Sequence, residues 1–148
     1  MPLALSLSFF APIALILAAI FAAYRPGRRP GILPRLSEAV ALLALALCAG
    51  GLAQVIAGAA QPVSILSGPF QLSLRADLVS ATMALLVGFI GWIVMRYSRS
   101  YLDGEEREGA FHALMLTHLA SDLVYAQAGS IATLVLGTFA VGLTLKRL

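Results

Sequence analysis

Two ionisable side chains, His118 and Asp122, stand four residues apart in an otherwise apolar stretch from Ala110 to Gln127. If that stretch is a helix, the spacing places both side chains on one face. If the helix crosses a membrane, the carboxylate costs about 2.5–3.5 kcal/mol on insertion scales, so it should face protein or water rather than lipid. The pair is therefore a candidate proton relay. The alternative is a buried pair that only fixes helix packing.

Other chemistry-bearing residues form no recognisable site. His112 is six residues from His118, so the two cannot share a helix face, and no metal site is expected. We interpret His112 as a packing or interfacial residue. The single cysteine, Cys48, lies in an apolar run and is expected in the core. Since no phosphate loop, nucleophile–base set or cofactor signature is present, we expect no catalytic residue, no cofactor and no enzyme activity of the chain alone.

The composition indicates a membrane protein. Of the 148 residues, 60% are hydrophobic and only 11% are charged, against about 25% in a soluble domain. A soluble protein of this size could not hide so much apolar surface, so a lipid bilayer is the expected partner. The net charge is +3, but the basic residues stand between apolar blocks and form no patch, so nucleic acid is not expected as a ligand.

The elements that would position these residues are five apolar stretches, each expected to cross the bilayer as a helix. They form a single all-α, polytopic transmembrane domain, with spans at about 3–23, 39–60, 78–96, 110–127 and 130–145. The first stretch lacks a positive leader and exceeds the ~7–15 residues of a signal peptide's apolar region, so we interpret it as a span. The break at 128–130 is weak, and a single uncharged span over 123–145 is an open alternative.

The connectors carry local signals of their own. Ser37 is predicted to cap the second helix, with Glu38 in its first turn. Arg75 and Asp77 are expected to pair at one membrane boundary. The segment from Gln61 to Arg75 alternates weakly and could include a short extended piece. The charged run at 103–108 is expected to be a solvated turn feeding the fourth helix.

Arginine and lysine counts orient the spans. The connectors after the first and third stretches carry four and three basic residues, the one after the second carries one, and the one after the fourth carries none. Alternate loops are therefore basic, as the positive-inside rule expects of five spans. This predicts an N-terminus outside and a C-terminus in the cytoplasm.

The stretch from Asp77 to Leu102 also carries a recognisable pattern, D-x-x-S-x-x-M, then V, then Y-S-x-x-Y. Its residues are Asp77, Ser80, Met83, Val87, Tyr97, Ser98 and Tyr101. The pattern resembles the N-terminal region of subunit L (chain 5) of NADH-quinone oxidoreductase. The same region occurs in the A subunit of Mrp sodium/proton antiporters and in the membrane subunit of Dab-type inorganic-carbon transporters. The sequence around 127–129 and 143–148 looks closest to the Dab type. The motif residues are expected to have a structural role.

Three departures qualify this resemblance. Phe139 stands where respiratory and Mrp members carry a glutamate, Thr138 replaces a usual tryptophan, and Ser130 replaces a usual asparagine. Family members are much longer, and the lysine-bearing broken helices of their proton path would lie beyond Leu148. The chain thus looks truncated before the antiporter core.

The resemblance implies a subunit of a proton- or cation-translocating complex in a bacterial inner membrane. Its implied partners are other membrane subunits: the remaining antiporter-like helices or, in the Dab branch, a large carbonic-anhydrase-like zinc subunit. The alternative is a non-conducting scaffold, or a fragment of a split subunit that stabilises its neighbours.

Overall fold

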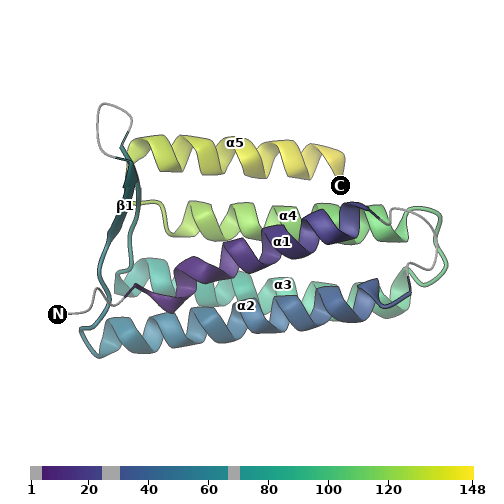
Figure 1. Cartoon of the computed structure of the whole chain (residues 1–148), viewed down its shortest axis with the longest axis horizontal. Coiled ribbons are helices and arrows are strands. Elements are labelled where there is room, and N and C mark those ends of the chain that lie inside the picture. Colours follow the sequence, from purple (N-terminus) through teal and green to yellow (C-terminus); the bar gives the residue numbers. More distant parts are fainter. Residues whose placement is uncertain (1–4, 25–30, 67–70) are drawn as a thin grey trace.

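The computed structural model describes residues 5–24, 31–66 and 71–148, which form a helical bundle with a small sheet at one end (Figure 1). A single 3-10 turn precedes the first helix. In chain order the elements are η1 (Leu7–Phe9), α1 (Phe10–Ala23), α2 (Leu33–Ile56), β1 (Val63–Leu66), β2 (Leu72–Leu74), α3 (Leu78–Tyr101), α4 (Glu108–Ala126) and α5 (Ile131–Arg147). Each expected span overlaps one helix. The all-α expectation was wrong in one respect, because it missed the paired strands.

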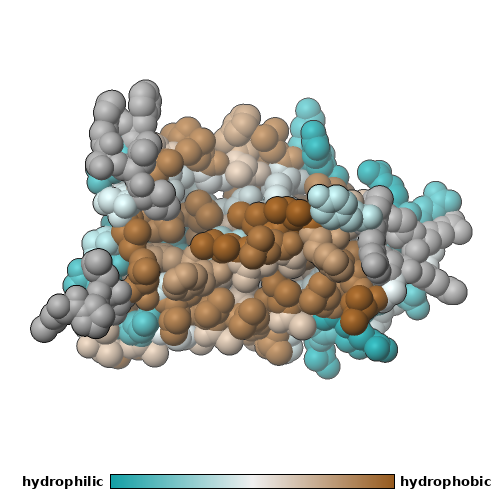
Figure 2. All heavy atoms as spheres, viewed as in Figure 1, coloured by the Kyte–Doolittle hydropathy of each residue, from teal (hydrophilic) through white to brown (hydrophobic). Residues whose placement is uncertain are grey.

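Two of the helices in the described ranges, α2 and α3, are long and apolar enough to cross a bilayer, and α1 belongs to a shorter apolar helix. In the most apolar window of α2 only 22% of the residues are buried inside the molecule, and in that of α3 only 33%. A core helix of a soluble protein would bury most of such a stretch. The visible face carries a broad apolar middle with polar groups toward the ends (Figure 2).

Small residues bring the helices together. Gly88 of α3 lies against Leu45 and Cys48 of α2, and Gly91 lies against Leu119 of α4. Alanines fill much of the remaining core beside larger buried side chains from α1 and α4. Such contacts are typical of helix packing where lipid surrounds the bundle, since small side chains let the backbones approach closely.

A two-stranded antiparallel sheet joins α2 to α3. Val63 pairs with Leu74 and Ser64 with Ser73, with an irregularity before Leu66. The expected extended piece between Gln61 and Arg75 is thus confirmed, while residues 67–70 within it lie outside the described residues. Two backbone bonds of 2.8 Å, Gly129 N–H to Ser73 O and Arg75 N–H to Gln127 O, tie β2 to the connection between α4 and α5.

The start of α2 corrects the sequence prediction. Ser37 is not the cap, because α2 begins at Leu33 with Pro34 in its first turn. Proline is tolerated there since its missing N–H would have no helical partner. Ser37 is instead fully buried, and its hydroxyl has no hydrogen-bond partner in the described chain. Glu38, expected to support the helix start, pairs with Arg96 and Arg99 of α3.

The later boundaries follow the predictions more closely. The helix breaks between Ala126 and Ile131, so the single uninterrupted span over 123–145 was wrong. Ser130 begins α5 by accepting a 3.2 Å bond from the Thr133 N–H. The charged run forms turns as expected, but it is not solvated throughout. Glu108, the first residue of α4, is buried because its carboxylate accepts a 3.1 Å bond from the Gly104 N–H.

The orientation rests on loop charges that the structure covers only in part. Arg25, Arg28 and Arg29 of the first connector lie outside the described residues. The start of α1 and the end of α5 lie at opposite ends of the bundle (Figure 1), as an odd number of passes requires. Which end faces the cytoplasm stays a prediction.

Candidate functional site

His118 and Asp122 lie in contact on α4. The distance from His118 Nε2 to Asp122 Oδ2 is 3.5 Å, slightly longer than the ~2.7–3.2 Å of an ordinary N–H···O bond. The side chains are 16% and 29% exposed, so neither is fully shielded by the described bundle. The geometry allows a proton to pass between the two groups after a small movement of either side chain.

Thr144 of α5 completes this arrangement. His118 Nδ1 lies 2.8 Å from the Thr144 hydroxyl oxygen, and that hydroxyl is 2.9 Å from Ala140 O and 3.0 Å from Val141 O on its own helix. The hydroxyl carries one hydrogen. When it donates to a carbonyl, its oxygen accepts from an Nδ1–H, and when it donates to Nδ1, the neutral imidazole carries its proton on Nε2. In both tautomers Nε2 is the nitrogen that faces Asp122.

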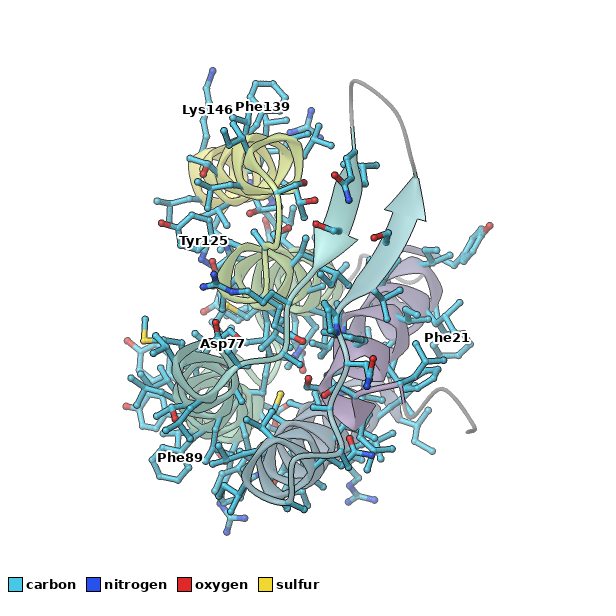
Figure 3. All side chains as sticks on the ribbon, turned by 90° about the vertical axis from the view of Figure 1, so that its left-hand side faces the viewer. Phe21, Asp77, Phe89, Tyr125, Phe139 and Lys146 are labelled. Carbon is cyan, nitrogen blue, oxygen red and sulfur yellow. The ribbon has the colours of Figure 1, made fainter. Side chains whose placement is uncertain are left out.

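The α4–α5 contact holds the three groups in place. A methyl group on Gly137 would lie 3.1 Å from the Cα of Tyr125, so glycine allows α5 to approach the α4 backbone. Tyr125 itself extends from the side of α4 next to α5 (Figure 3). By helical spacing, Tyr125 shares one face of α4 with Phe111, Met115 and the His118–Asp122 pair. Thr144 was not predicted as a site residue, because its distance from α4 depends on how α4 and α5 pack.

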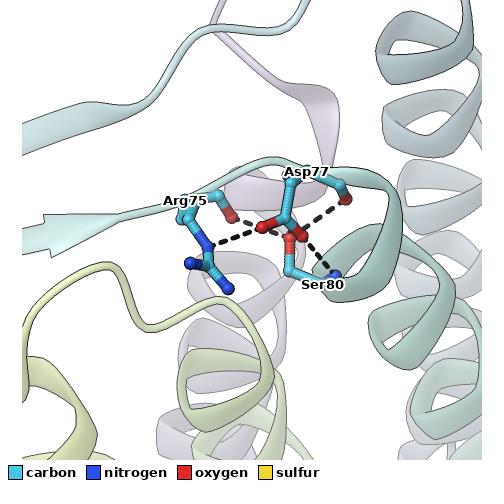
Figure 4. Close-up of polar contacts among 3 residues, drawn as sticks. All are labelled: Arg75, Asp77 and Ser80. Carbon is cyan, nitrogen blue, oxygen red and sulfur yellow. Dashed lines mark hydrogen bonds and ion pairs between the residues drawn. The ribbon is translucent and has the colours of Figure 1, made fainter.

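The motif residues at the start of α3 form a helix cap. The Ser80 N–H donates to Asp77 Oδ1 at 2.7 Å, and the Asp77 N–H donates to the Ser80 hydroxyl at 3.0 Å. The expected pairing with Arg75 is confirmed, with Nε 2.7 Å from Asp77 Oδ2 (Figure 4). This reciprocal arrangement satisfies N–H groups that a helix start leaves free.

The cap also affects the acidity of Asp77. The pKa of its carboxyl lies below the ordinary value of 3.8, chiefly because the Ser80 N–H donates to the ionised form. The Ser80 hydroxyl and the Arg75 guanidinium lower the pKa further, against an opposing effect of burial. Asp77 is thus held ionised and oriented, which suits a structural role.

Of the other motif residues, Met83 lies one turn after the cap, whereas Tyr97, Ser98 and Tyr101 lie at the opposite end of α3. Tyr97 and Tyr101 stack with ring centroids 5.6 Å apart and are 67% and 72% exposed. Ser98 is buried and donates to Val94 O at 2.7 Å, and Met83 is half exposed. The motif residues therefore do not converge on one site.

Two buried polar features lie at opposite ends of α4. Only the second was not predicted from the sequence, since His112 was interpreted as a packing or interfacial residue. His112 is fully buried, and neither ring nitrogen has a hydrogen-bond partner in the described ranges. At the other end of α4, the Ser8 hydroxyl donates to Gln127 Oε1 at 2.9 Å and lies 2.9 Å from Ser6. Serine and glutamine are too common to signal such a network before the helices are placed. Among the described residues no group of three His, Cys, Asp or Glu could hold a metal ion.

Fold and site together define an apolar helical bundle of the kind found in membranes, in which an ionisable pair on α4 lies beside α5. Residues 63–112 match the family model of the N-terminus of chain 5 of NADH-ubiquinone oxidoreductase (complex I). The match covers about a third of the chain, from β1 through α3 to the first turns of α4. No curated protein matches the chain.

The matched segment contains every motif residue from Asp77 to Tyr101 and ends before His118 and Asp122. It therefore supports the resemblance on the residues that suggested it. It has no bearing on the pair in α4, on the Dab-type branch or on truncation. A chain-5-like segment of complex I implies a membrane setting and other membrane subunits, without fixing which ones.

Proposed function

We propose that this chain is a membrane subunit of a proton- or cation-translocating complex, similar to the N-terminal part of subunit L. The observation that carries the proposal is the match over residues 63–112, which coincides with a structural unit of hairpin, capped helix and acidic turn. The exposed apolar faces of α2 and α3 support a bilayer location, since large hydrophobic surfaces rarely face water.

The pair on α4 is the proposed proton-handling element. With one proton shared between Asp122 and His118, either both groups are neutral or the carboxylate faces an imidazolium. Both states carry no net charge, so exchange between them avoids the cost of an isolated ion in lipid. Protons would enter and leave at Asp122, which is the more exposed of the two groups.

The proposal is tested by removing the chain from its native membrane. Sealed vesicles are prepared from cells with and without the gene, and proton uptake is measured with a pH-sensitive dye. We expect the chain in the carbonate-resistant membrane fraction and a loss of coupled proton uptake without it, restored by the gene on a plasmid. A chain that carbonate extracts, or uptake that is unchanged by deletion, would contradict the proposal.

A finer assignment, to the Dab-type branch, rests on residues around Gln127 and near Leu148, beyond the matched segment. It would give the chain a large carbonic-anhydrase-like zinc subunit as partner and CO2 uptake as the coupled process. Mild-detergent purification of the tagged chain checks this. Zinc in stoichiometric amount and a large soluble-type subunit favour this branch, whereas quinone-reducing or antiporter subunits favour the other relatives.

A non-conducting scaffold is the second candidate function. The observation in its favour is that His112 and His118 lie on different sides of α4, and no polar chain in the described residues links them. Under this alternative the chain only stabilises its neighbours. Proton uptake would then depend on assembly of the complex and would be indifferent to the charge at residue 122.

A further inference from the structure

Asp122 is incompletely satisfied within its own chain. Its carboxylate has a single polar partner in the described part of the protein, His118 at 3.5 Å, and 29% of the side chain is exposed. An ionised carboxylate offers about four acceptor positions. The Asp122 carboxylate can therefore accept further hydrogen bonds, although the exposed side chains around it are apolar.

Helix geometry places this carboxylate between α5 and α3. His118 faces α5 through Thr144, and Leu119 faces α3 through Gly91. Successive residues turn by about 100°, so Asp122 lies about 40° from His118 toward the Leu119 direction. Met115, about two turns before Asp122 on α4, also points between the His118 and Leu119 directions.

The side of α4 that carries Asp122, between α5 and α3, is not covered by another helix of the described bundle. Viewed along the bundle, α5, α4 and α3 form a row, with α1 on one side and Tyr125 extending on the other (Figure 3). On α3, Met83 and Ile90 lie about 80–100° around the helix from Gly91, which faces α4, and on the side away from Gly88, which faces α2. They are 49% and 53% exposed, so the α3 part of this side is apolar. We call this surface the open flank; it consists of Met83, Ile90, Met115, Asp122 and Tyr125.

Lipid cannot satisfy this surface. Acyl chains match the methionines and Ile90 but offer no donor to a carboxylate. Once the shared proton has left, ionised Asp122 faces a neutral His118, and exposure of that carboxylate costs about 2.5–3.5 kcal/mol on insertion scales. A cation on a neighbouring helix would supply donors and opposite charge at once. A neighbouring helix that carries a lysine or arginine therefore suits this surface better than lipid does.

We propose that a transmembrane helix of a partner subunit docks on the open flank and places a lysine or arginine against Asp122. The inference rests on the proposed function, since it requires the chain to lie in a membrane beside other subunits. It adds the place of contact and the chemistry that selects the partner.

The test uses the full chain in native membranes, with a photo-crosslinking amino acid at Met115. The matched control carries the same amino acid at Val124, which is also partly buried on α4 but faces the other side of the helix. We expect a protein adduct from Met115 and not from Val124. Mass spectrometry of the adduct should identify an apolar peptide of another subunit containing a lysine or arginine.

Charge dependence makes the result specific. Asp122→Asn should lower the adduct yield by at least about tenfold, because it leaves the partner's cation unpaired. Asp122→Glu should retain it, and Asp122→Lys combined with an acidic residue at the identified cation should restore it. Carbonate extraction of each variant shows whether it still inserts.

Lipid adducts only, a second copy of this chain, a peptide without a cation, or a yield unaffected by Asp122→Asn would each overturn the inference. These results leave the proposed function standing as long as the chain resists carbonate extraction. A chain that is extracted contradicts the proposed function itself.

Discussion

At the scale of single residues, the 2.8 Å contact of the Thr144 hydroxyl with His118 Nδ1 orients the imidazole so that Nε2 faces Asp122. Thr144→Val should leave Nδ1 without a partner and lower the free energy of unfolding in detergent by about 1–3 kcal/mol. Nitrogen NMR of labelled histidine should show a changed tautomer. Thr138→Val is the control, since the Thr138 hydroxyl bonds only Leu134 O of its own helix. Equal effects of the two substitutions would contradict this role.

Asp77 gives a prediction for pH. Its folded-state pKa lies below 3.8, so the unfolded chain binds protons more readily, and ionisation stabilises the start of α3. This stabilisation is complete above the ordinary pKa and is lost as the pH falls through the lowered one. Hydrogen exchange in the first turn of α3 should therefore accelerate in that acid range relative to neighbouring turns. Asp77→Asn should remove the pH dependence, and its persistence would count against the cap.

At the scale of elements, the α4–α5 contact depends on Gly137. Gly137→Ala would place a methyl group 3.1 Å from Tyr125 Cα, so α5 must shift and the bond between Thr144 and His118 should lengthen. We expect destabilisation of about 1–3 kcal/mol, as for overpacked sites. Gly142→Ala on the same helix meets nothing within 4 Å and should be neutral or stabilising by up to about 1 kcal/mol. Thermal unfolding in one detergent compares the two, and the reverse order would refute the packing argument.

Elements with strong local signals could be predicted from the sequence. Asp77 and Ser80 mark the start of α3 because their side chains bond each other's backbone. The break at 128–130 was only a weak signal, and the structure was needed to show that Ser130 caps α5 there. The start of α2 was missed because Ser37 resembles a cap, although Pro34 fits the first turn equally well.

Features that depend on tertiary packing could not be predicted. The 2.8 Å bond that ties Ser73 to Gly129 joins residues far apart in the chain. The spacing of His118 and Asp122 predicts their shared face, but Thr144 becomes their neighbour only after α5 packs on α4. Local patterns identify helix faces, whereas the partner of each face is set by the whole bundle.

At the scale of the whole molecule, the ends of α3 should lie on opposite sides of the membrane. Single cysteines in a Cys48→Ala background at Arg75 and Tyr101, both well exposed, can be labelled with a membrane-impermeant reagent in sealed vesicles. We expect residue 75 to react from the outside and residue 101 from the cytoplasmic side, as the loop charges predict. Labelling of both from one side would show that α3 does not span.

Proton handling by the α4 pair in a membrane complex is tested by Asp122→Asn in the native complex. The measurement is the rate of coupled proton uptake in sealed vesicles that contain equal amounts of assembled complex. Thr117→Val on the same helix serves as control, because the Thr117 hydroxyl bonds only Ala113 O. We predict at least about a tenfold loss with Asp122→Asn, as for a proton-transfer group, and near-normal uptake with the control. Normal uptake by the Asp122→Asn complex would contradict the relay and favour the scaffold.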